Sequence, residues 1–107
     1  MHFSTIVRLH NTDSRDSIGF GRGIVQLLRG VQEYGSLNKA TKAMGMAYSK
    51  AWRILNETEE EFGIKLLERE GAHGSNLTPE CLKLLEVYDE MLAASNAAVD
   101  KVFKKHF

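Results

Sequence analysis

Cysteine, proline and long apolar runs are nearly absent from this sequence. Cys81 is the only cysteine among 107 residues, which excludes an internal disulfide and a zinc site built from cysteine pairs. No apolar stretch approaches the roughly 20 residues that span a bilayer, and residues 1–10 lack the charged start and apolar run of a secretory signal. We therefore expect a protein without a membrane segment that stays in the cytoplasm.

A net charge is missing as well, because 14 basic residues balance 14 acidic ones. The total charge gives no reason to expect a nucleic-acid partner, so any such reason must come from where the charges lie. The four histidines are scattered without the spacing of a metal motif, and we predict no metal and no cofactor. The remaining composition, 43% hydrophobic and 26% charged, is that of one packed domain.

The first twenty residues predict a strand and a turn. From His2 to His10, Phe3, Val7 and Leu9 share one side with Thr5 while polar residues occupy the other, a pattern broken only by Ile6. Such alternation is typical of a half-buried strand. Residues 11–17 are polar and can hydrogen-bond their own backbone, which predicts a turn followed at most by a short return strand.

Three helices are predicted next. Apolar residues spaced i, i+3, i+4 and i+7 mark a helix from about Arg22 to Tyr34, which the following glycine can end. Ser36 is a suitable N-cap for a short second helix that Gly45 closes. Ala47 to about Phe62 contains neither glycine nor proline, and we expect Trp52 on its inward face to anchor this third helix to the core.

The remaining residues predict a hairpin and a long helix. Residues 64–69 are short, apolar and strand-like, and the polar segment 71–76 separates them from Leu77-Thr78 as the loop of a hairpin would. Thr78 is a good N-cap and Pro79 suits the first helical position, so a last helix begins there and runs to about Lys105. At roughly 1.5 Å per residue this helix is near 40 Å long and should project from the globule.

The last helix carries more apolar surface than one domain core requires. Apolar and small residues recur along it at alternating spacings of three and four, as in a coiled-coil seam, and further apolar residues flank them. We predict that its outer half pairs with a second copy of the chain, in parallel or antiparallel orientation; packing on its own domain alone is the alternative. The predicted dimer contacts are Leu84, Tyr88, Met91, Leu92, Ser95, Ala98, Val99 and Val102.

The order of strand, three helices, two-stranded wing and helix is that of a winged helix-turn-helix, a mainly α fold with a small β part. We expect residues 1–78 to form this unit and residues 79–107 to form its C-terminal dimerisation helix, within one domain. In such a motif one helix crosses the phosphate backbone and a tight turn leads to a second helix angled into the major groove. Gly45 can supply the turn, Met46 an apolar plug beneath it, and Ala40 a close approach between helices.

Short motifs along the chain agree with this fold. They are residues 21–23 (Gly-Arg-Gly), 35–37 (Gly-Ser-Leu), 40–48 (Ala-Thr-Lys-Ala-Met-Gly-Met-Ala-Tyr), 51–52 (Ala-Trp), 62–63 (Phe-Gly), 66–69 (Leu-Leu-Glu-Arg) and 77–78 (Leu-Thr). In these motifs the chain resembles the N-terminal DNA-binding domain of the molybdate-responsive regulators of the ModE type and, more distantly, the LysR-type regulators, over about residues 19–90. The resemblance implies a non-enzymatic protein that binds double-stranded DNA and regulates transcription.

The same resemblance implies which side chains meet the DNA. Residues of the second helix would lie near the phosphate backbone, residues at the start of the third helix would enter the major groove, and the wing would lie along the neighbouring minor groove or phosphates. A plain surface hairpin is the alternative for the wing. The implied contacts are Ser36, Lys39 and Lys42, then Tyr48, Ser49, Lys50 and Arg53, and in the wing His73, Ser75 and Asn76.

Charges along the third helix are segregated in a way that the total hides. Lys50 and Arg53 lie in its first half, whereas Glu57 and the glutamates at 59–61 crowd its second half. Cations and hydroxyls at the leading end can reach phosphates and base edges, and the helix N-terminus itself favours an anion. Ordinary solvated surface charges are the alternative for the two cations.

Departures from the ModE type leave a second function open. Ala47 stands where that family usually has serine, and His73 where a lysine is common. The chain ends where ModE-type proteins continue into molybdate-binding domains, so we expect no molybdate site within it. The balanced charge and Ala47 favour an alternative, a protein-interaction adaptor on the same scaffold. No enzyme motif is found, since Cys81 has no nearby histidine and no phosphate-binding glycine loop with lysine is present.

Overall fold

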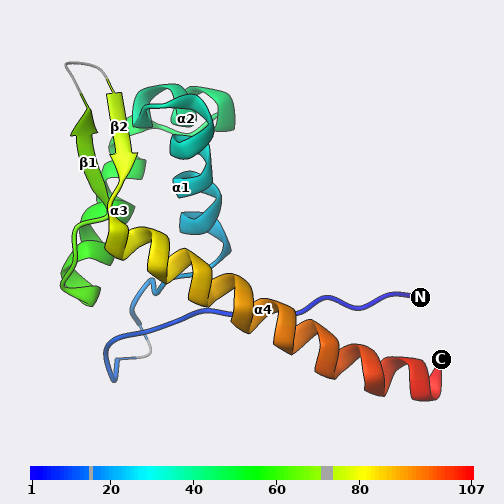
Figure 1. The fold of residues 1–107 in the computed structure, drawn as a ribbon. Coiled ribbons are helices and arrows are strands. Elements are labelled where there is room, and N and C mark those ends of the chain that lie inside the picture. The colour runs from blue at the N-terminus through cyan, green and yellow to red at the C-terminus, as the bar shows by residue number, and fades with distance from the viewer. Residues whose placement is uncertain (15, 71–73) are drawn as a thin grey trace.

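A computed structural model describes residues 1–14, 16–70 and 74–107. Three helices and a two-stranded antiparallel wing form one body, and a long last helix crosses this body and projects from it (Figure 1). This is the mainly helical winged helix-turn-helix that the sequence predicts. The elements in order are α1 (Arg22–Tyr34), α2 (Leu37–Met44), α3 (Tyr48–Phe62), β1 (Leu67–Glu70), β2 (Gly74–Leu77) and α4 (Pro79–His106).

The core lies between α1, the middle of α3 and the first half of α4. The ring of Phe20 is fully buried there and meets two other rings edge-on, those of Phe62 at 6.2 Å and Tyr88 at 6.0 Å between centroids. Edge-to-face packing is a favoured arrangement of aromatic pairs, so this cluster ties the segment before α1 to α3 and α4. The helices contribute Ile24, Val25, Leu27, Leu28, Val31, Leu37, Ala40, Ala51, Leu55, Cys81 and Leu85.

The turn and the small residue predicted around α2 are confirmed. Gly45 ends α2 in the left-handed conformation with φ of 66°, where a side chain would be strained. Met46 follows and packs against the core. Ala40 is fully buried against α1, where a Cβ placed on Gly30 would lie 3.2 Å from the Cβ of Ala40. Ala40 thus lets α2 lie close to α1, and Gly45 and Met46 form the turn that connects α2 to α3.

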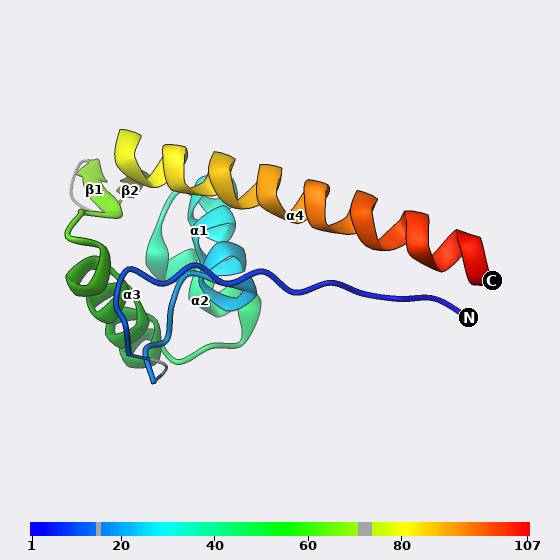
Figure 2. The ribbon, with the colours of Figure 1, turned by 90° about the horizontal axis from the view of Figure 1, so that it is seen from below.

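The N-terminal strand predicted over residues 2–10 does not form. Residues 1–10, called here the arm, are extended, but only Leu9 makes a β-type pair, a single antiparallel bridge with Phe20. Figure 2 shows the arm running alongside α4 toward the C-terminal end of that helix. The predicted alternation is nevertheless confirmed, because odd-numbered residues from Phe3 to Leu9 are half-buried and their even-numbered neighbours are exposed.

The partner of the arm is a helix instead of a sheet. The Phe3 ring packs 5.2 Å from that of Phe103, and the Thr5 hydroxyl donates to the side-chain oxygen of Asn96. A strand needs a neighbouring strand to satisfy its backbone groups, whereas a half-buried extended segment needs only an apolar surface beside it. The outer half of α4 supplies that surface, so alternation predicts the buried side of the arm but not its partner.

The wing differs from its predicted bounds. The ladder pairs Leu67 with Leu77 and Glu70 with Gly74, so β1 starts later than predicted and β2 starts earlier. Ser75 and Asn76, predicted as loop, are part of β2. Ladder hydrogen bonds join backbone groups, so polar residues at the surface can form a strand without the apolar pattern that reveals one in the sequence.

α4 has 28 residues, about 42 Å at 1.5 Å per residue. Tyr88 is its last buried residue, and the rest of the helix extends the molecule to 54 Å along its longest axis. Thr78 starts the helix, since its hydroxyl accepts from the Cys81 amide at 3.1 Å and donates to the Lys65 carbonyl at 2.5 Å. Among the residues described, no helix has both the length and the apolar character that crossing a bilayer requires.

Candidate nucleic-acid interface

A surface groove lies where the beginnings of α2 and α3 meet the wing. The Ser75 amide donates to the Gly35 carbonyl at 2.9 Å, which fixes β2 against the turn between α1 and α2. We call this surface the α2–α3 groove. Its lining includes Ser36, Lys39, Tyr48, Trp52, Glu68 and Ser75. Four side chains that the sequence assigned to DNA contact, from α2, α3 and the wing, thus lie around one hollow.

Ser36 has a structural role that the sequence assignment underrates. It is only 5% exposed, and its hydroxyl oxygen accepts from the Lys39 amide at 3.1 Å as the N-cap of α2. Ser36 therefore has a structural role as the cap of α2, and it also lines the groove, so its contact with DNA stays a prediction. Lys39 and Lys42 are exposed; Lys39 lines the groove, while Lys42 lies in the last turn of α2 outside it.

The leading end of α3 is open to solvent. Tyr48, Ser49, Lys50 and Arg53 are all exposed. Ala47 is the N-cap and provides no side-chain hydrogen bond, so the first amides of α3 lack the usual side-chain acceptor. Free amides and the positive end of the helix dipole attract an anion, and two cationic side chains stand on the adjoining turns.

Trp52 does not anchor α3 to the core, and the prediction that it does is wrong. It is 40% exposed and lines the α2–α3 groove, with its ring edge-on to that of Tyr48 at 6.1 Å and 86°. The buried stripe of α3 consists of Ala51, Leu55 and Thr58, at i, i+4 and i+7. Trp52 follows the first of these by one residue, about 100° around the helix, and that offset is the signal that could have placed it at the surface.

The wing residues predicted to contact DNA differ in their position. Ser75 is half-buried in the groove. Asn76 is exposed, does not line the groove, and its side-chain oxygen accepts from the Leu77 amide at 3.0 Å. His73 lies outside the described residues.

The acidic second half of α3 has partners within the chain. The Glu59 carboxylate accepts from the Leu66 amide at 2.7 Å, which holds the approach to β1. The Glu61 carboxylate accepts from the Asn11 amide at 2.8 Å, which holds the end of the arm. Two of the acidic residues therefore stabilise the fold at the end of α3 farthest from its exposed cations.

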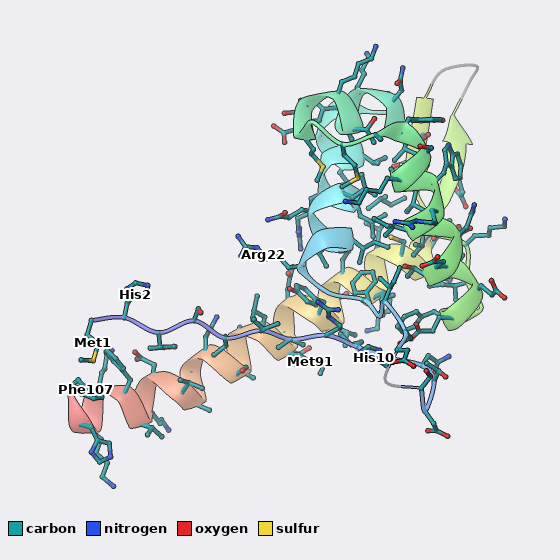
Figure 3. All side chains as sticks on the ribbon, turned by 180° about the vertical axis from the view of Figure 1, so that it is seen from behind. Met1, His2, His10, Arg22, Met91 and Phe107 are labelled. Atoms are coloured by element: carbon teal, nitrogen blue, oxygen red, sulfur yellow. The ribbon has the colours of Figure 1, made fainter. Side chains whose placement is uncertain are left out.

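The residues predicted to form a seam on α4 differ in exposure. Tyr88 is 5% exposed and belongs to the core, so its assignment as a contact with a second copy is corrected. Leu84, Leu92 and Ser95 are half-buried, and Ala98 is exposed. Met91, Val99 and Val102 are 44%, 38% and 60% exposed. Figure 3 shows Met91 near the middle of α4, beyond the part that the core covers.

Side chains that could bind a metal or act as a nucleophile are dispersed in the part of the chain that the structure describes. Within residues 1–14, 16–70 and 74–107, no three histidine, cysteine or acidic side chains gather as a metal site requires. Cys81 is buried, and burial, with a smaller effect from Glu59, raises the pKa of its thiol to about 12. A thiol with so high a pKa stays protonated at neutral pH and is a poor nucleophile.

Comparison with known proteins agrees with this geometry. The profile of a family described as bacterial regulatory helix-turn-helix proteins, lysR family, matches residues 24–82, which run from α1 into the first turn of α4. A crystal structure of a CbnR_DBD–DNA complex contains a similar fold, with a TM-score of 0.59 over 78% of this chain and 94% of that one; the two are 23% identical. The matched family consists of regulatory proteins, which agrees with the prediction that the chain is not an enzyme.

Two curated relatives are of the ModE type. The transcriptional regulator ModE of Yersinia pestis is 29% identical over 80 residues, which is 71% of this chain and 30% of that protein. The molybdenum transport protein ModE of Herbaspirillum seropedicae is 32% identical over 69 residues, 61% of this chain and 26% of that protein. The chain thus matches less than a third of the length of these relatives.

Proposed function

Since the chain belongs to the lysR family of bacterial regulatory helix-turn-helix proteins, we propose that it regulates transcription by binding double-stranded DNA, with the start of α3 in the major groove. The observation that carries this proposal is the exposed, cationic leading end of α3. Lys50 and Arg53 are exposed there, and the helix N-terminus has no side-chain cap. Such an end offers amides and cations to phosphates and side chains to base edges.

The surroundings of α3 support the same orientation on DNA. Lys39 lies across the α2–α3 groove and can meet the phosphate backbone, while Lys42 is exposed on the following turn of α2. The wing is hydrogen-bonded to the α1–α2 turn, which holds it beside α2. A duplex lying over the start of α3 would have α2 on one flank and the wing on the other, as the winged helix geometry requires.

We further propose that the chain binds DNA as a homodimer. Met91, Val99 and Val102 are exposed on the outer half of α4, and apolar side chains repeated along a projecting helix are favourably buried by a second helix. The arm lies along Asn96 and Phe103, beside this stripe. A two-fold dimer would present two α3 helices to the two halves of an inverted repeat.

The adaptor alternative, which the balanced charge and Ala47 favour, is the second candidate. An adaptor would need a surface for another protein, and the acidic end of α3 is less suited to that, because Glu59 and Glu61 make hydrogen bonds within the chain. The balanced total charge remains compatible with either function, because the cations of α3 are separated from its acidic residues.

The experiment that tests the proposal is selection of bound sequences from random DNA, followed by binding measurements across a salt series. We expect an enriched inverted repeat, because two recognition helices related by two-fold symmetry read the same half-site twice. Affinity for that repeat should fall steeply as salt rises, since phosphate contacts release counterions. A chain that binds no DNA even at low salt would overturn the proposal and favour the adaptor alternative.

A further inference from the structure

The most unexpected side chain on the proposed DNA surface is Trp52. It is 40% exposed and pairs edge-on with Tyr48, which is 47% exposed. Both rings line the α2–α3 groove beside Lys39. Large aromatic side chains are normally driven into a core, so two of them side by side at the surface indicate an interaction site.

The fold itself does not need the indole. The buried residues of α3 are Ala51, Leu55 and Thr58, which are at most 2% exposed, and Ile54 and Phe62 of the same helix pack against the core. Trp52 is the more exposed side chain, and none of the fully buried positions of α3 depends on it. Circular dichroism of a Trp52 variant checks that the fold is kept, and the variant then probes the surface.

The groove around the two rings also limits what they can contact. Glu68 lines it on the wing side, and Lys39 stands on the α2 side. The Glu68 carboxylate disfavours a phosphate on the wing side of the groove, because the like charges repel. The apolar feature that a duplex offers in its major groove is the C5-methyl group of thymine.

We propose that Trp52, with Tyr48 beside it, is a specificity-determining residue that reads thymine methyl groups by apolar contact. This inference depends on the proposed DNA binding by α3 and names one base chemistry for it. The cations at the start of α3 supply affinity that is independent of sequence, whereas the indole distinguishes thymine from bases that lack the methyl group. Trp52→Phe should keep part of this discrimination, since a phenyl ring retains an apolar face, although it is smaller than indole and lacks the N–H donor.

The test replaces thymine by uracil in the selected DNA site, one position at a time, and so removes a single methyl group with no change in hydrogen bonding. We expect the wild-type chain to bind at least one such site about fourfold more weakly, the effect of one buried methyl group. Trp52→Ala should bind the thymine and uracil forms of that site equally. Tyr34→Ala is the matched control, because Tyr34 is 43% exposed at the end of α1 and does not line the groove.

The outcomes separate this inference from the function on which it depends. A wild-type chain that binds its site but shows no uracil effect, or a Trp52→Ala variant that keeps the full effect, overturns the reading of methyl groups and leaves DNA binding intact. Equal weakening of the thymine and uracil forms by Trp52→Ala also overturns it, because the ring then contacts the sugar or backbone. A chain without affinity for any duplex overturns both.

Discussion

Arg53 and Lys50 carry the positive charge at the leading end of α3, and both side chains are exposed. We predict that Arg53→Ala and Lys50→Ala each weaken DNA binding without changing the fold, because neither side chain packs in the core. If the replaced residue contacts a phosphate, its loss should also reduce the slope of log affinity against log salt concentration by about one. Fluorescence anisotropy over a salt series measures both quantities, and circular dichroism checks the fold.

The matched control for these variants is Lys83→Ala, which removes an exposed cation from the first turns of α4. Its affinity and salt slope should stay close to those of the wild type. If Arg53→Ala and Lys50→Ala also behave like the wild type, the assignment of the α3 end to the major groove is wrong.

Cys81 gives a prediction about pH. Burial raises the pKa of its thiol from 9.0 to about 12, so the folded state favours the protonated thiol. This contribution to stability is complete below the ordinary pKa and is lost as the pH rises toward that of the folded state. The free energy of unfolding should therefore decrease between pH 9 and 12. Urea unfolding should show a steeper decrease in the wild type than in Cys81→Ala; equal slopes would contradict the buried thiol.

Among the elements, α4 depends on its first residue. The Thr78 hydroxyl caps the helix through the Cys81 amide and also donates to the Lys65 carbonyl beside the wing. We predict that Thr78→Ala destabilises the chain by about 1–3 kcal/mol, because it removes the cap and leaves the Lys65 carbonyl without that donor. Urea unfolding measures the loss. Thr78→Ser keeps the hydroxyl and should recover most of it, whereas equal losses in both variants would show that the methyl group matters instead.

The elements also differ in how far the sequence determines them. The helices were predictable because their apolar spacing and terminal residues, such as Gly45 and Thr78, agree. The arm was not, because alternation at Phe3 and Leu9 identifies a buried side without naming what covers it. At the site, the exposed cations of α3 followed from the sequence, but Trp52 did not, because one position around a helix separates a core residue from a groove residue.

At the scale of the whole molecule, the outer half of α4 projects beyond the core with Met91, Val99 and Val102 exposed. We predict that Met91→Glu lowers the dimer content, because a charge at a buried apolar seam must be desolvated without a partner. Sedimentation velocity over a range of concentrations measures this. Exposed Glu90→Gln is the control and should dimerise like the wild type. A Met91→Glu chain that dimerises normally would place the interface elsewhere.

The course of the arm has a practical consequence. Met1 and Phe107 lie at the same end of the molecule, remote from α2 and the wing (Figures 1 and 3). A dye pair attached to the two ends would therefore show efficient energy transfer while the arm stays docked on α4, and weaker transfer once it detaches. Tethering a chain to a sensor chip by either end would leave the α2–α3 groove facing the solution, so immobilised protein can capture duplexes without steric hindrance from the surface.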